Sequence, residues 1–394
     1  MKKILLGTSA LCAVAVAGPA FAQSANEPVK LGIGGYWNSA YGYMVSQSGL
    51  NKNGRRADDI DTDAIINIKV STKLDNGFTV GASVQLRGQN QVPAAANSPD
   101  LTTPTPDMVK RSYAYIRGDF GEFRIGDDDD ARRQKAMTAP LAGGLFGANT
   151  PDLIFANGSP ALTNTTMKTI STTKRVSRLL YYTPTIAGFS FAVSYAPGGE
   201  KGSTGPANAP SLTPTNGVNA INNEVSAAVA YNGKFGDFGL DAYVGGSSGH
   251  RVRAATVGNQ QTGRNNPSAI GGGGVVTFGP FAFGGAYEYL QDRDEALVGG
   301  AHQTRNTWDI GGRYTIGPFS ASLDWTRAIL QNFNGNSSAT NDVASLVGDY
   351  VLGPGIDVGA ALDWTHYKPS AGNAALNGPN YTGVALMAGL GIAF

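Results

Sequence analysis

The sequence lacks features on which many protein classes depend. Its single cysteine is Cys12, and Cys12 falls in an N-terminal stretch that carries Lys2 and Lys3. An apolar run from Ile4 to Gly18 and the small-residue pattern Ala20-Phe21-Ala22 follow, as is typical of a cleaved export signal. Cleavage after residue 22 leaves no cysteine, so neither a disulfide framework nor thiol chemistry is expected in the exported protein.

An excess of charge of either sign is also missing. Without Lys2 and Lys3, the 30 basic residues become 28, against 29 acidic ones, and a nucleic-acid partner is not expected. No apolar run of about 18 residues follows the export signal, so helical membrane spans are not expected. Because no linker divides residues 23–394, this range is predicted to form one domain after the signal of residues 1–22.

Glycine is abundant, and the chain is rich in segments whose apolar residues recur at every second position. The 54 glycines are about twice the usual share. In the segment 78–87, Phe78, Val80 and Val84 alternate with small or polar residues. Such alternation, bounded by turn residues, is typical of β-strands with two different faces.

The alternating segments number sixteen, and their connections differ sharply in length. The predicted strands are 31–44, 62–74, 77–89, 107–118, 122–126, 174–184, 188–196, 222–232, 238–247, 268–278, 281–291, 304–316, 318–329, 341–352, 355–367 and 381–394. Short turns such as Gly279-Pro280 alternate with long connections, of which the third, 127–173, is the longest. This pattern predicts an all-β fold: a transmembrane antiparallel barrel of 16 strands with short periplasmic turns and long outer loops.

Several short motifs then resemble the Gram-negative general diffusion porins. They are the turn Arg117-Gly118-Asp119-Phe120-Gly121 followed by Phe123-Arg124-Ile125-Gly126, the strand end Tyr182-Thr183-Pro184 followed by Ala187-Gly188-Phe189, and the terminal Phe394. The resemblance implies a homotrimer in the outer membrane, a third loop folded into the pore, and Phe394 as part of the assembly signal. It also implies that the second long loop, 90–106, either latches a neighbouring subunit or caps its own barrel.

The residues expected inside the barrel follow from assigning the apolar member of each alternation to lipid, because charge on the lipid face is costly. The early strands then contribute basic side chains and the later strands acidic ones. The basic set is Lys69, Arg87, Arg124 and Arg178, with Arg111 and Arg117 added if charge outweighs Tyr113 and Tyr115, which share their parity. The acidic set is Asp241, Glu288, Asp309 and Asp324.

The resemblance further implies that acids of the third loop face basic wall residues across a constriction. The candidates on the loop side are Asp127, Asp128, Asp129, Asp130 and Asp152. Asp127 departs from the family, which typically has a basic residue there, and Arg132, Arg133 and Lys135 offer charges that would neutralise the run. Opposed charges of this kind would order water and favour polar solutes.

Metal binding and catalysis receive little support. Asp59, Asp61 and Asp63 have the spacing of a calcium loop, and are weak Ca²⁺ candidates, but the glycine and the distal glutamate of an EF-hand are absent. No nucleophile motif accompanies the three histidines. The sequence therefore predicts a passive porin without cofactor, for ions and small hydrophilic solutes. A solute-specific channel and a non-channel surface barrel, such as an adhesin or a barrel enzyme, remain alternatives.

Overall fold

A computed structural model describes residues 28–48, 57–88, 109–148, 175–198, 221–251, 266–292, 303–332, 337–368 and 380–394. These residues form sixteen strands and one short helix. The elements are β1 (Lys30–Ser48), β2 (Asp58–Lys73), β3 (Thr79–Arg87), β4 (Val109–Gly118), β5 (Gly121–Asp128), α1 (Ala131–Lys135), β6 (Val176–Tyr182), β7 (Phe189–Ala196), β8 (Ile221–Phe235), β9 (Phe238–Arg251), β10 (Ser268–Phe278), β11 (Phe281–Asp292), β12 (Gln303–Ile316), β13 (Phe319–Asn332), β14 (Ser337–Gly353), β15 (Ile356–Lys368) and β16 (Tyr381–Ala393).

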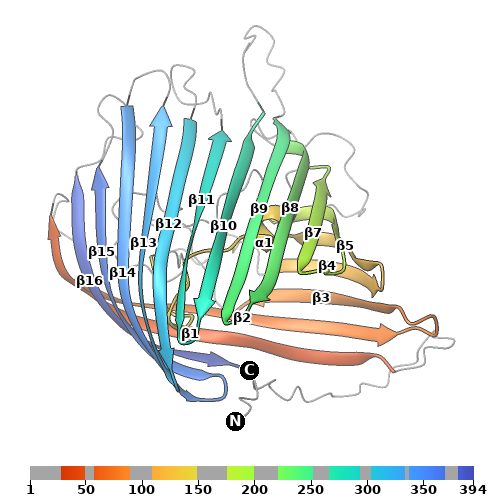
Figure 1. The fold of residues 1–394 in the computed structure, drawn as a ribbon, viewed down its shortest axis with the longest axis horizontal. Helices are drawn as coiled ribbons and strands as arrows, with labels where there is room; N and C mark the ends of the chain where they lie inside the picture. The colour runs from red at the N-terminus through yellow and green to blue at the C-terminus, as the bar shows by residue number, and fades with distance from the viewer. Residues whose placement is uncertain are drawn as a thin grey trace, which may run out of the picture.

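The strands close into an antiparallel barrel in which each strand pairs with its neighbours in sequence (Figure 1). The first strand, β1, pairs with both β2 and β16, and this second pairing closes the sheet. Gly35 N–H donates to the carbonyl of Phe394 at 2.8 Å, and Phe394 N–H donates to the carbonyl of Gly35 at 3.1 Å. The predicted fold class of a sixteen-strand barrel is confirmed.

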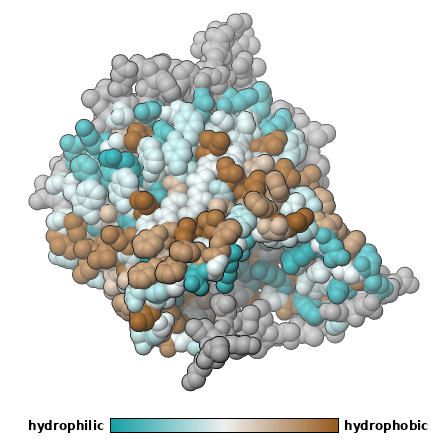
Figure 2. All heavy atoms as spheres, viewed as in Figure 1, coloured by the Kyte–Doolittle hydropathy of each residue, from teal (hydrophilic) through white to brown (hydrophobic). Residues whose placement is uncertain are grey.

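Side chains alternate between the two faces of the sheet. On β13, Leu323 is 61% exposed on the outer face, whereas its neighbour Asp324 is 1% exposed on the inner face. Figure 2 shows apolar residues in a band across the visible face, below a rim of hydrophilic ones. The same alternation places Arg111 and Arg117 on the inner face of β4 together with Tyr113 and Tyr115, so charge decides the parity of this strand.

The short connections are tight turns, and glycine occupies the positions in which the backbone has positive φ. Gly279 and Gly317 have φ of 54° and 56° and lie in the two-residue turns of adjacent hairpins. Such turns favour glycine because the left-handed region costs it little. No helix within the described ranges has the length and hydropathy needed to cross a lipid bilayer.

The third long connection begins later than the sequence suggests. The ladder of β5 continues through Asp127 and Asp128, which pair with Ser177 and Val176 of β6, so the loop starts at residue 129 rather than 127. From there to residue 148 the chain runs inside the barrel, where α1 contacts β7, β8 and β9 (Figure 1). We call residues 129–148 the inner loop.

The two main-chain hydrogen bonds of Phe394 give a test of how the barrel closes. Deleting Phe394 removes both bonds, whereas Phe394→Ala keeps them and removes only the ring. Because each such bond contributes about 0.5–1.5 kcal/mol, the deletion is expected to lower stability more than the substitution. The measurement is the denaturant midpoint of the heat-modifiable band on SDS gels, and equal midpoints for the two variants would contradict this account of closure.

Candidate functional site

The inner loop begins at a point where wall serines accept hydrogen bonds from its main chain. Ala131 N–H donates to Ser194 Oγ at 3.1 Å, and Arg132 N–H donates to Ser226 Oγ at 3.0 Å. Asp130 is the N-cap of α1: its Oδ1 accepts from Arg133 N–H at 3.0 Å and from Ser226 Oγ at 2.8 Å. Acceptors from β7 and β8 thus satisfy the N–H groups that a helix start leaves free.

Acids of the later strands hold the rest of the inner loop. Glu288 on β11 forms an ion pair with Arg132 at 2.7 Å, and both side chains are fully buried. Asp309 on β12 accepts from Ala139 N–H at 2.9 Å, and Asp324 on β13 accepts from Ala148 N–H at 2.6 Å. These carboxylates therefore anchor the loop rather than present free charge to the lumen.

Apolar contacts complete the attachment. Leu145 and Phe146 pack with Val347, Ala361 and Met387, which point inward from β14, β15 and β16. Gly359 permits this approach, because a Cβ there would already lie 3.3 Å from Leu145 and Phe146. The described contacts between residues 136–148 and the strands are with β1, β8, β9 and β11–β16 and none is with β2–β4, so the wall formed by β2–β4 faces this part of the loop across the lumen.

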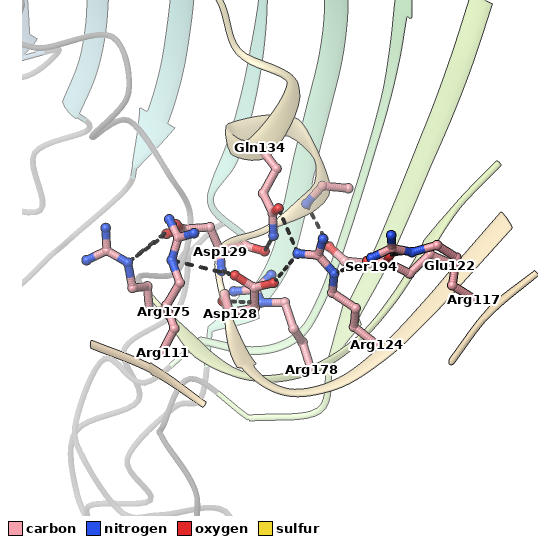
Figure 3. A network of polar contacts seen from close by, with 11 residues as sticks. Arg111, Arg117, Glu122, Arg124, Asp128, Asp129, Gln134, Arg175, Arg178 and Ser194 are labelled. Carbon is pink, nitrogen blue, oxygen red and sulfur yellow. Dashed lines mark hydrogen bonds and ion pairs between the residues drawn. The ribbon is translucent and has the colours of Figure 1, made fainter. Parts of the chain in front are cut away.

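Arginine side chains surround the acids at the base of the inner loop (Figure 3). Arg124 Nη1 lies 3.0 Å from Asp128 Oδ2, and Arg111 Nε lies 3.7 Å from Asp128 Oδ1. Asp129 forms ion pairs with Arg111, with Arg133 at 3.3 Å and with Arg175 at 3.3 Å. Four arginines therefore share two carboxylates. We call Asp128, Asp129, Arg111, Arg124, Arg133 and Arg175 the arginine cluster.

The acidic and the basic side chains of the arginine cluster differ in their exposure to solvent. The side chains of Asp128 and Asp129 are 1% and 2% exposed, whereas those of Arg111, Arg124, Arg133 and Arg175 are 31%, 19%, 18% and 19% exposed. The carboxylates lie beneath the guanidinium groups, so water and solutes in the lumen meet positive charge.

The arginines also determine the charge state of the loop acid. Burial alone would raise the pKa of Asp129, but the guanidinium groups of Arg133, Arg111, Arg175 and Arg178 outweigh this effect and hold the pKa of that carboxyl below its usual value. Asp129 therefore stays ionised to lower pH than an isolated aspartate does. Its ion pairs, and their contribution to stability, are lost only as pH falls through this lowered pKa.

Aromatic rings and further acids fix the neighbouring arginines. The Arg124 guanidinium lies over the rings of Tyr113 and Tyr182, at 4.6 Å and 4.7 Å from the centroids. Arg117 and Arg124 both donate to Glu122, at 2.6 Å and 2.5 Å. Because a guanidinium held on two sides has few rotamers open to it, Arg124 presents its charge from a fixed position.

The structure separates the predicted acids of the loop into different environments. Asp127 lies on the outer face of β5, in the same parity as Ile125, and accepts from Ser177 Oγ at 2.5 Å, so its assignment to the constriction is wrong. Asp130 is also wrong as a pore residue, because it is fully buried as the helix cap. Asp128 and Asp129 contact the wall arginines directly and do not oppose them across a gap. Asp152 lies outside the described residues, as do the second long loop and the export signal.

The predicted basic wall lies on the inner face, although its members differ in surroundings. Lys69 is exposed, and Arg87 follows Gln85 in the inner parity of β3. Arg178 is fully buried, donates to the carbonyl of Asp128 at 2.8 Å and pairs with Glu224 at 3.0 Å, so it supports the arginine cluster from beneath. Of the lumen acids, Asp241 accepts from Asn232 near the short-turn end.

Sequence reasoning missed the helix and one of its most important neighbours. The five-residue helix is too short for a periodic pattern, although Asp130 as a cap and basic residues in the last turn are its signals. Arg175 falls inside the predicted strand 174–184 and shares the parity of Leu179, so the alternation assigns it to the lipid face; in the structure β6 begins only at Val176, and Arg175 contacts Asp129 instead. Glu122 and Glu224 were missed as partners because cross-strand pairing is needed to find them.

The calcium candidates are not arranged as a binding loop. Asp59, Asp61 and Asp63 lie within the extended strand β2, where alternate residues are about 7 Å apart and cannot converge on one ion as a loop does. Asp63 accepts from Tyr36 Oη at 2.6 Å. No group of three or more His, Cys, Asp or Glu with metal-binding geometry occurs among the residues that the structure describes.

Comparison with known proteins places the chain among outer-membrane channels. A family model described as Gram-negative porin matches residues 7–370. No curated protein matches the chain. Among solved structures, an anion-selective porin from Comamonas acidovorans is 16% identical with a TM-score of 0.59, covering 93% of this chain and 100% of that one. The outer membrane channel DcaP of Acinetobacter baumannii is 13% identical with a TM-score of 0.58, covering 94% and 99%. OmpT of Vibrio cholerae, in a trimer form, is 10% identical with a TM-score of 0.55, covering 93% and 100%.

The hydrogen bond between Asp324 and the inner loop can be tested directly. Asp324→Ala leaves the buried N–H of Ala148 without an acceptor, at a cost of about 1–3 kcal/mol, so this end of the loop is expected to shift from the wall. Single-channel recordings should then show altered conductance and more current noise. Ser320→Ala, on the same face of β13 but at its short-turn end, is the control. Identical recordings for Asp324→Ala and the unaltered protein would count against the anchoring function.

Proposed function

Since the chain belongs to the Gram-negative porin family and is a diffusion channel of the bacterial outer membrane, we propose that its pore admits small hydrophilic anions in preference to cations. Passage is passive and needs neither a cofactor nor a catalytic step. The observation that carries this proposal is the difference in exposure within the arginine cluster, whose cations face the lumen while its acids are buried.

The charge balance of the arginine cluster supports the preference. Its four arginines and two aspartates carry a net charge of +2. In a channel with low-dielectric walls, fixed charge of one sign concentrates counter-ions of the other. Buried acids have little effect on the lumen, because the guanidinium groups above them screen their field. Anions should therefore be enriched where the inner loop leaves the wall.

The wall formed by β2–β4 also carries positive charge on its inner face. Lys69 is exposed on the inner face of β2, and Arg87 shares that face on β3, which lies across the lumen from residues 136–148 of the inner loop. The later-strand acids that would oppose this field, Glu288, Asp309 and Asp324, are occupied in holding the loop. The similar porin of Comamonas acidovorans is itself described as anion-selective.

Removing two arginines of the cluster tests the preference. Arg111→Ala with Arg124→Ala takes away both cation partners of Asp128 and exposes its carboxylate, so the reversal potential under a salt gradient is expected to shift toward the value for cations. Lys73→Ala with Lys234→Ala removes the same charge near the short-turn end and is the matched control. If the two double variants shift the potential equally in planar bilayers, the cluster does not determine selectivity.

We also propose that the protein is a homotrimer, and the short strands on one side of the barrel support a subunit contact there. Strands β5, β6 and β7 have 8, 7 and 8 residues. Eight residues extend about 27 Å, or about 20 Å along the membrane normal when tilted, which is less than the apolar band of about 25 Å. A subunit-covered face does not need to span that band. The outer surface of β4–β7 carries an apolar groove of about 550 Å³ lined by Ile116, Phe123, Ile125, Leu179, Tyr181 and Val193. A neighbouring subunit is proposed to pack there.

Polar substitution on the two sides of the barrel distinguishes a subunit contact from a lipid contact. Ile125 and Ile270 are 61% and 56% exposed on the outer faces of β5 and β10. Ile125→Ser is expected to lower the temperature at which the oligomer band dissociates on SDS gels, and Ile270→Ser should leave it unchanged. Equal effects of the two substitutions, or an unheated sample that migrates as a monomer, would refute the proposed contact face.

A further inference from the structure

Two pairs, each of a tryptophan and a basic residue, lie side by side on the outer face of the barrel, near the ends of β13 and β15 that lead to the long connections. Arg327 lies over the ring of Trp325, 5.7 Å from its centroid. The rings of His366 and Trp364 are stacked, with centroids 5.9 Å apart and planes 10° apart. Lys368, two residues beyond His366 in the same parity, is an exposed basic side chain on the same face.

The strand between the two pairs forms the floor of a slot. Ala344 on β14 is in register with Trp325 on one side and with Trp364 on the other. Two residues farther toward the outer end, Asp342 is in register with Arg327 and His366. A small side chain between two tryptophans leaves room that a larger residue would fill. The slot is therefore apolar at its base and charged at its top.

The apolar base continues into a large groove toward the membrane centre. This groove has a volume of about 1310 Å³ and lies over β10–β14. Trp325, Ala344 and Leu346 line it beside the slot, and glycines of β10–β12, including Gly274 and Gly312, leave its floor low. The strands here are long, with 14 residues in β13 and 17 in β14, so this side can span the lipid unaided.

We propose that the slot and groove together bind an acyl lipid with a phosphorylated headgroup. The acyl chain lies in the groove and between the two tryptophans, and the phosphate lies against Arg327 and His366 at headgroup level. The partner is a membrane lipid rather than a soluble phosphate, because the charged top and the apolar base form one continuous surface.

The ion pair between Arg327 and Asp342 prepares the headgroup position. Arg327 Nε lies 2.9 Å from Asp342 Oδ1, and its Nη2 donates to Asp342 Oδ2 at 3.1 Å. Asp342 is 5% exposed and Arg327 is 42% exposed, so the acid is covered while one edge of the guanidinium remains open. A planar guanidinium fixed in this way suits a tetrahedral phosphate. His366 is held on the other side, with Nδ1 2.8 Å from Thr382 Oγ1.

Quenching of tryptophan fluorescence by brominated lipid measures this binding. Trp37→Phe with Trp308→Phe leaves Trp325 and Trp364 as the only tryptophans of the protein. The full chain is reconstituted in mixed vesicles of phosphatidylcholine and phosphatidylglycerol, in which one lipid or the other carries bromine on its acyl chains. The anionic lipid is expected to be preferred about fivefold at these two residues, because a basic side chain near a membrane surface contributes about that factor.

Three variants in this background test which residues supply the preference. Arg327→Gln with Asp342→Asn removes the guanidinium without leaving an unpaired acid on the lipid face, and should lower the ratio toward one. Ala344→Leu fills the slot without changing charge and should lower the ratio as well. Asp58→Asn, at the Tyr41–Asp58 pair on β1 and β2, alters charge at the outer rim away from the slot and should leave it unchanged. A ratio near one before substitution, or a preference that survives both slot variants, would overturn the proposal.

Discussion

The need to pair every main-chain polar group is the constraint on which this structure depends. Lipid offers no hydrogen-bond partner, so the sheet must close, and it closes where Gly35 and Phe394 exchange bonds. Closure fixes the register of each strand, and the register fixes which side chains face lipid and which face the lumen. The inner loop then meets the same constraint inside the barrel, since it has no ladder of its own from residue 136 to residue 148.

Side chains of the barrel wall supply the hydrogen-bond partners that the main chain of the inner loop needs. Several of the charged side chains in the barrel serve this purpose. Asp309, Ser322 and Asp324 accept from Ala139, Ala142 and Ala148, in place of the carbonyls that a strand would supply. A serine or carboxylate at an inward position of a strand thus accepts the hydrogen bonds that a neighbouring strand would accept in a sheet. Glu288, Asp309 and Asp324 are used to hold the loop, so these three acids do not present free charge to the lumen opposite the basic side chains.

The alternation of residues along a strand explains why the sequence predicts which side chains face lipid and which face the lumen. Arg124 and Asp324 lie on the inner face, as the sequence predicts, because a strand has a period of two and because charge on the lipid face is costly. Asp127 failed for the same reason: it was placed in a loop, where parity carries no meaning, but β5 continues past it and turns it outward. Arg175 and the cap function of Asp130 depend on contacts between segments that are distant in the chain, and a local pattern contains no information about them.

What a solute encounters depends on which charged side chains are exposed to the lumen and which are buried, rather than on the number of charges. The run from Asp127 to Asp130 looks acidic in the sequence, yet one member faces outward, one caps a helix, and two lie beneath arginines. Arginine can cover an acid in this way because its long side chain reaches over the carboxylate and its planar head can contact two carboxylates at once, as Arg111 does by donating to Asp129 and lying 3.7 Å from Asp128. An acidic segment therefore builds a positively charged surface, and the inner loop acts on solutes through the arginines that it holds in place.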